Sequence, residues 1–146
     1  MRADDERDGR ALIERLGLAA HPEGGWYRET WRAESGLGQR AGGTTILFLL
    51  EAHERSHWHR VDADEHWFWH AGAPLILSIA PPGGPACDLL LGPDIFDGQM
   101  PQGWVPAHHW QASTPHGGWT LVSCTVTPGF DFAGFSLAPP DWSPPG

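Results

Sequence analysis

Apolar residues recur at helical spacing near the start of the chain. Leu12, Ile13 and Leu16 stand among charged residues in this way, and Gly17 follows where a helix would end. The pattern predicts a short N-terminal helix over residues 5–17. Residues 21–25, His-Pro-Glu-Gly-Gly, then interrupt regular structure because proline and glycine favour turns.

From residue 26 the pattern changes to short runs rich in aromatic and β-branched residues. Turn residues separate the runs, and 19 glycines and 14 prolines allow many tight turns. The runs predict strands over residues 26–32, 44–51, 56–60, 65–71, 75–80, 86–91, 104–105, 110–113, 119–127 and 135–137. About ten short strands in roughly 120 residues are typical of an all-β sandwich or barrel of the jelly-roll type.

The length and composition fit one globular domain. A chain of 146 residues can enclose a core, and nine tryptophans and six phenylalanines supply material for it. We expect a single domain over residues 1–146, with its core at about 12–138 and a frayed, proline-rich tail at 139–146.

The uneven charge distribution narrows the choice of partners. The net charge is −9, and all nine basic residues are arginines within the first 60 positions. Residues 61–146 contain eight carboxylates and no basic residue, which argues against nucleic acids and anionic membrane surfaces. The lack of lysine excludes Schiff-base chemistry and P-loop phosphate binding.

The sequence also predicts the cellular compartment of the protein. No run approaches the roughly 18 apolar residues of a membrane-spanning helix, and the charged N-terminus has no apolar signal core. Cys87 and Cys124 form no CxxC pair, and Cys124 stands in an apolar run where a small core residue is the commoner role. We therefore expect a reduced, cytoplasmic protein.

Residues 57–72 carry the pattern that best indicates chemistry. His57 and His59 are two positions apart, so on a regular strand both imidazoles point to one face. After a tight turn, Glu65 opens the next apolar run and can approach the two imidazoles. Such a set predicts a site for a divalent transition metal, whether Fe, Mn, Ni or Zn.

These residues have other roles open to them. His59 and Glu65 could act as catalytic acid or base, because a carboxylate among tryptophans has its pKa raised by desolvation. Alternatively, His57 and His59 lie at a solvated hairpin end with their imidazoles hydrogen-bonded to carbonyl groups, and Glu65 pairs with Arg28 or Arg60.

Further candidates lie on two other predicted strands. Gln111 would be a weak, neutral fourth metal ligand, and His109 on the same face could substitute for it, unless His109 lies in a surface turn. Arg28 could clamp an anionic ligand group, or instead pair with a carboxylate such as Glu23.

Two tryptophans complete the expected ligand pocket. Trp67 shares a face with Glu65 by strand parity, and Trp110 neighbours Gln111. Gly24-Gly25 is interpreted as a turn rather than a phosphate loop, because no helix follows it.

The sequence resembles the cupin superfamily. His57-x-His59, Glu65 and Gly72 match the first cupin motif, with five residues rather than about four between His59 and Glu65. At the second motif, Gln111 stands where a histidine is usual.

The chain is more closely similar to the small cupin family DUF985, or Cupin_5, over about residues 12–137. The matching segments lie at residues 21–25, 27–30, 45–50, 59–61, 64–67, 101–106, 110–112 and 126–132. The resemblance implies a double-stranded β-helix barrel that is usually a homodimer, and it implies no particular reaction.

Three functions follow as hypotheses. The first is a metal-dependent enzyme that acts on a small polar or acidic metabolite, by isomerase, lyase, decarboxylase or dioxygenase chemistry. The second is a metal-free epimerase or isomerase in which His59 removes a proton and Asp64 or Glu65 orients it. The third is a cupin that binds a small-molecule ligand without chemistry.

Overall fold

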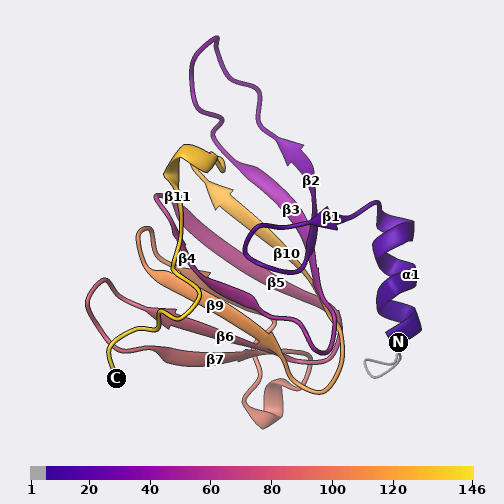
Figure 1. Cartoon of the computed structure of the whole chain (residues 1–146). Helices are drawn as coiled ribbons and strands as arrows, with labels where there is room; N and C mark the ends of the chain where they lie inside the picture. The colour runs from indigo at the N-terminus through magenta and orange to yellow at the C-terminus, as the bar shows by residue number, and fades with distance from the viewer. Residues whose placement is uncertain (1–5) are drawn as a thin grey trace.

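The computed structural model describes residues 6–146, in which one helix precedes two antiparallel sheets (Figure 1). The elements in chain order are α1 (Glu6–Leu16), β1 (Ala19–Ala20), β2 (Trp26–Arg32), β3 (Thr44–Leu50), β4 (Ser56–Val61), β5 (Asp64–Gly72), β6 (Leu75–Ala80), β7 (Cys87–Leu91), η1 (Ile95–Asp97), β8 (Gln102–Val105), β9 (Trp110–Pro115), β10 (Thr120–Thr127), η2 (Phe132–Gly134) and β11 (Phe135–Leu137). No helix among the described residues has the length and apolar character needed to cross a membrane.

The two sheets bring distant parts of the chain together. The larger has the strand order β1-β2-β3-β10-β5-β8, and the smaller has the order β11-β4-β9-β6-β7. Strands remote in sequence become neighbours, as when β3 pairs with β10 and β4 pairs with β9. This is the jelly-roll barrel that the strand pattern predicts.

The core lies between the sheets because alternate residues of each strand point inward. Strand β10 shows the alternation most clearly, with every second residue buried. Its Val122 and Cys124 pack against Phe48, Trp67 and Leu77 from other strands. Burial therefore confirms the core role expected for Cys124.

Helix α1 covers the outside of the larger sheet rather than the barrel interior. Its apolar residues Leu12, Ile13 and Leu16 pack with the buried Leu49 and Trp119. The predicted strands agree with the observed ones to within two residues at either end, and the pattern missed only the two-residue β1. Position 5, where the helix was predicted to begin, lies outside the described residues.

The expectation that the proline-rich tail is frayed is wrong for Trp142. Its ring lies 4.5 Å from that of Trp110 and 6.1 Å from that of Trp58, measured between centroids. The guanidinium of Arg60 also lies over the Trp110 ring, 4.7 Å from its centre. The tail therefore packs on the outer face of β4 and β9, because aromatic surface there is available to cover.

Candidate functional site

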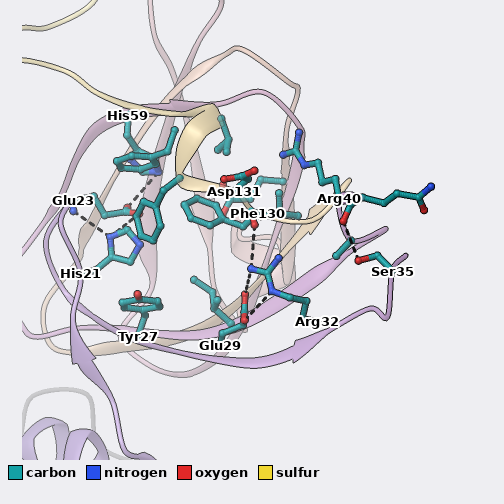
Figure 2. A pocket seen from close by; sticks show the side chains of 18 residues that line it. His21, Glu23, Tyr27, Glu29, Arg32, Ser35, Arg40, His59, Phe130 and Asp131 are labelled. Carbon is teal, nitrogen blue, oxygen red and sulfur yellow. Dashed lines mark hydrogen bonds and ion pairs between the residues drawn. The ribbon is translucent and has the colours of Figure 1, made fainter. Parts of the chain in front are cut away.

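A cavity of about 580 Å³ opens into the barrel between the two sheets (Figure 2). Its polar inner wall includes His21, Glu23, His59 and Glu65. Rings from Tyr27 and from the segment at residues 130–135 form another part of the lining. The residues come from the turn before β2, from β2, β4 and β5, and from the segment that leads into β11.

The turn at residues 21–25 places Glu23 inside the barrel. Its backbone is closed by hydrogen bonds from His21 N–H to Gly25 O at 2.9 Å and from Gly24 N–H to His21 O at 3.0 Å. The N–H of His57 on β4 donates to Glu23 O at 2.8 Å and holds the turn against the sheet. The side chain of Glu23 is only 8% exposed as a result.

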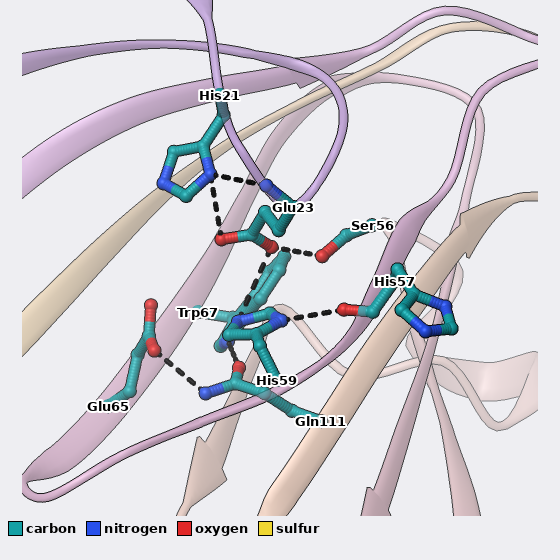
Figure 3. Close-up of polar contacts among 8 residues, drawn as sticks. All are labelled: His21, Glu23, Ser56, His57, His59, Glu65, Trp67 and Gln111. Atoms are coloured by element: carbon teal, nitrogen blue, oxygen red, sulfur yellow. Dashed lines mark hydrogen bonds and ion pairs between the residues drawn. The ribbon is translucent and has the colours of Figure 1, made fainter. Parts of the chain in front are cut away.

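Glu23 has three polar side-chain neighbours, all shown in Figure 3. The hydroxyl of Ser56 donates to Glu23 Oε2, and His59 Nε2 lies 3.3 Å from the same oxygen. His21 Nδ1 accepts the N–H of Glu23 at 3.1 Å and lies 3.3 Å from Glu23 Oε1. Because Nδ1 accepts, the ring proton of neutral His21 stands on Nε2.

His59 is held in one tautomer. Its Nδ1–H donates to the carbonyl of His57 at 2.8 Å, so in the neutral ring the lone pair is on Nε2 and faces Glu23. The residue is 2% exposed and pairs directly with Gln111 of β9 across the sheet.

A second chain of hydrogen bonds orients Glu65. Trp67 Nε1 can only donate, so the Gln111 oxygen must face it, at 2.8 Å. The Gln111 amide nitrogen then points to Glu65 Oε1, also at 2.8 Å, and bridges the two sheets (Figure 3). Glu65 therefore accepts a hydrogen bond from the Gln111 amide and does not form an ion pair with an arginine in the described part of the chain.

Burial dominates the electrostatics of these groups. Desolvation raises the pKa of Glu23 to about 8, against the opposing hydrogen bond from Ser56. Desolvation likewise raises the pKa of Glu65 to about 7, with the charge of His59 acting against it. It lowers the pKa of His21 to about 4 and lowers the pKa of His59. Near neutral pH, the Glu23 carboxyl group therefore holds a proton beside neutral imidazoles, whereas Glu65 lies close to its pKa.

The structure does not bring His57 together with His59 and Glu65. The His57 ring contacts the Pro139 carbonyl through Nε2 at 2.9 Å and Arg55 through Nδ1 at 3.1 Å, away from the cavity. The expectation of a shared face is wrong because β4 pairs irregularly with β9 between Ser56 and His59, as in a β-bulge. The extra residue turns Ser56 and His59 inward and His57 outward.

The predicted metal ligands do not fit a metal site. Gln111 has its oxygen engaged by Trp67 and turns its N–H₂ towards Glu65, so it presents a donor where a ligand oxygen would be needed. Across residues 6–146, no group of three His, Cys, Asp or Glu side chains is arranged to hold an ion. The substitute His109 has its Nδ1 3.3 Å from Ala107 O and does not line the cavity.

None of the four expected ligand-binding residues lines the cavity. Trp67 and Gln111 are fully buried beside it rather than exposed to it. Arg28 is exposed on β2 and is not part of the cavity lining, and Trp110 stacks with Trp142 on the outer face. The alternative partners suggested for Glu65 and Arg28 are also wrong, since Glu65 binds Gln111 and Glu23 contacts Ser56 and the two histidines.

The sequence interpretation missed His21, Glu23 and Tyr27. The signal was a histidine and a glutamate two positions apart in a turn that the family resemblance already contained. A turn alone does not reveal which way its side chains face, and this one folds inward over β4.

The fold and the buried polar site define a cupin-type barrel protein. The chain matches the family described as Cupin superfamily (DUF985) over residues 10–138, and it belongs to that family. No curated protein matches the chain.

Solved structures agree with this assignment. Protein SO0799 from Shewanella oneidensis is 39% identical with a TM-score of 0.83, covering 88% of this chain and 82% of that one. A hypothetical protein from Leishmania major is 34% identical with a TM-score of 0.79, covering 88% and 86%. Oxalate decarboxylase from Bacillus subtilis, which has Mn(II) centres, shares the fold alone, at 11% identity, a TM-score of 0.63, and coverage of 81% and 29%.

The turn at residues 21–25 generates a stability prediction. Gly24 has φ +108°, and an added Cβ would collide with the Arg55 carbonyl oxygen. Gly24→Ala should lower the free energy of unfolding by about 3 kcal/mol or more, since a clash adds to the left-handed strain. Gly83→Ala is the matched control, because Gly83 has φ +74° with nothing within 4 Å and should lose only about 1 kcal/mol. If urea denaturation showed that both variants lose the same free energy of unfolding, the turn would not be packed tightly against the Arg55 carbonyl.

The raised pKa of Glu23 predicts a pH dependence of stability. The folded protein keeps a proton that the unfolded chain releases between the ordinary pKa of 4.5 and about 8, so the linked stability is present below pH 4.5 and is lost as the pH rises towards 8. The lowered pKa of His21 acts in the opposite sense, but between about 4 and 6.5. The window from pH 6.5 to 8 therefore reports mainly the carboxyl groups.

In that window the free energy of unfolding should fall by about 2 kcal/mol in the wild type. Glu23→Gln should remove most of this slope, because the amide keeps the shape but cannot titrate. Glu34→Gln, which alters an exposed residue outside the cavity, should keep it. If urea denaturation showed the same change of unfolding free energy with pH in all three proteins, the assignment of the buried proton to Glu23 would be contradicted.

Proposed function

We propose that this protein binds a small organic molecule in the barrel cavity and moves protons on it, as an isomerase or epimerase does. The observation that carries the proposal is the contact of His59 Nε2 with Glu23 Oε2 at 3.3 Å on the cavity wall. An imidazole with a fixed tautomer and a carboxyl that shares its proton make an acid–base pair.

Glu65 is proposed as the base that removes a proton from the ligand, while the His59–Glu23 pair supplies one. It lines the same cavity, and the donors Gln111 and Cys124 favour its carboxylate form. Two carboxyl groups whose surroundings differ can divide the acid and base roles between them. Here the Glu23 carboxyl group contacts the His59 imidazole and accepts one hydrogen bond from Ser56, whereas Glu65 accepts hydrogen bonds from Gln111 and Cys124.

The proton balance is simple. Glu65 takes a proton from a carbon next to a carbonyl group, and the electron pair of the broken C–H bond moves into the carbonyl. The His59–Glu23 pair returns one proton to the ligand at another position or from another side. The cycle closes when the proton on Glu65 exchanges back to the pair, so the ligand is rearranged without gain or loss of atoms.

The metal-dependent enzyme expected from the sequence is the competing candidate. Its support is membership of a superfamily with metal-containing relatives such as oxalate decarboxylase. The orientation of Gln111 and the outward side chain of His57 favour the metal-free alternative.

The homodimer and the cytoplasmic location also stay predictions. Light scattering tests the first, and cell fractionation tests the second.

Hydrogen–deuterium exchange tests the proposed chemistry without a known substrate. Small carbonyl compounds with an exchangeable C–H are incubated with the protein in D₂O and followed by ¹H NMR. The wild type should accelerate exchange of at least one of them, and His59→Asn and Glu65→Gln should each lower the rate by about 10²–10⁴-fold, the usual contribution of general acid–base catalysis.

The matched control is His116→Asn, which changes an exposed histidine outside the cavity and should exchange at the wild-type rate. Circular dichroism and thermal melting establish that the variants are folded. Binding without exchange by the wild type, or undiminished exchange by His59→Asn, would refute the proposed proton transfer.

Elemental analysis distinguishes the metal-dependent enzyme from the metal-free one. Protein purified without a histidine tag or chelator should contain far less than one Fe, Mn, Ni or Zn per chain, and dialysis against these ions should not change its melting temperature. Near-stoichiometric metal that His59→Ala removes would instead support the metal-dependent enzyme.

A further inference from the structure

The charged groups inside the cavity are unbalanced towards acids. Glu23 and Glu65 are 9% and 7% exposed, and their neighbours there are the imidazoles of His21 and His59. No lysine exists in the chain. Buried carboxyl groups without a cation are costly to ionise, so a ligand that brings a positive charge would relieve that cost.

The two arginines that line the cavity are already engaged, and Figure 2 shows the contacts of Arg32 with Glu29 and Phe130. Arg32 donates to Glu29 through Nη2 at 2.6 Å and Nε at 3.2 Å, and to the Phe130 carbonyl at 3.1 Å. Arg40 donates through both Nη atoms to Asp62, at 3.0 and 2.8 Å, and through Nε to the Gly129 carbonyl at 2.7 Å.

An anionic ligand would therefore have to displace existing partners of Arg32 or Arg40. Both arginines hold the backbone of residues 129–130, so their release would also disturb the adjacent wall. The described part of the lining offers an anion no free cationic side chain.

Aromatic rings form a further part of the wall. Phe130, Phe132 and Phe135 lie within 4.8–5.9 Å of one another, measured between ring centroids. The rings of His21 and Tyr27 are 4.5 Å apart, and the His21 ring lies 6.2 Å from that of Phe135. Such ring faces attract cations through their quadrupoles and also stack on flat molecules.

We infer that the cavity selects a flat organic cation, such as an amine or amidinium group carried on a ring, over an anion of the same shape. This inference rests on the proposed function only in taking the cavity as the ligand site. The cationic group would lie towards Glu23 and Glu65, and the flat body would lie against the phenylalanine rings.

Binding of a cation should also release protons. Glu23 faces His21, Ser56, His59 and Glu65, and none of these supplies a permanent positive charge. Glu65 in turn faces His59, Glu23, Gln111 and Cys124. A bound cation favours the ionised carboxylates, so protons held at neutral pH would pass to the solvent.

Three probes of one shape test the inference: benzamidine, benzamide and benzoate, which are cationic, neutral and anionic. Isothermal titration calorimetry at pH 7 should give benzamidine an affinity about tenfold or more above that of benzamide, with benzoate weakest. Comparison of phosphate and Tris buffers should show proton release with benzamidine but not with benzamide.

Single substitutions test which side chains determine the preference for a cation. Glu65→Gln should lower the affinity for benzamidine without changing that for benzamide, and Glu34→Gln, on an exposed loop, should change neither. Glu29→Gln should improve benzoate binding, because it frees Arg32 from its ion pair. Tighter binding of benzoate, equal affinities, or no binding of any probe by the wild type would overturn the inference. None of these results depends on deuterium exchange, so the two proposals can fail separately.

Discussion

The contact between the Glu23 carboxyl and β4 is the interaction on which the site depends. A buried carboxyl group is costly unless polar neighbours surround it, and Glu23 has Ser56, His59 and His21 around it. The same contact seats the turn at residues 21–25 over the barrel, with the backbone bond from His57 as its second support. One interaction therefore closes this part of the barrel and brings the Glu23 carboxyl group against the His59 imidazole.

Hydrogen-bond direction explains why the two buried carboxyl groups differ. The indole of Trp67 has a donor and no acceptor, so it determines the orientation of the Gln111 amide, which in turn offers N–H to Glu65. Glu23 instead lies beside an imidazole that can exchange a proton with it. Two groups of the same type thus have different surroundings, because the indole N–H of Trp67 cannot act as an acceptor.

The arginines near the opening have a structural task that shapes the cavity. Arg32, at the end of β2, and Arg40, between β2 and β3, both bind the backbone at residues 129–130. Their carboxylate partners Glu29 and Asp62 complete the connection, and the ion pair with Arg40 lowers the pKa of Asp62. These contacts hold the phenylalanine segment in place as one wall of the cavity. Counting basic residues in a sequence does not distinguish such paired arginines from ones that bind a ligand.

The sequence by itself determined the jelly-roll barrel, because the alternation of apolar residues within strands and the turn residues between them are local signals. It also placed His59, Glu65 and Gln111 on strand positions, and all three are buried. It misplaced His57 because a bulge in β4 reverses the alternation, and bulges depend on how two strands pair. Glu23 and His21 were missed for a related reason. Only the tertiary structure decides that their turn folds inward onto β4, since the partners that make burial of Glu23 favourable lie more than 30 residues away in the chain.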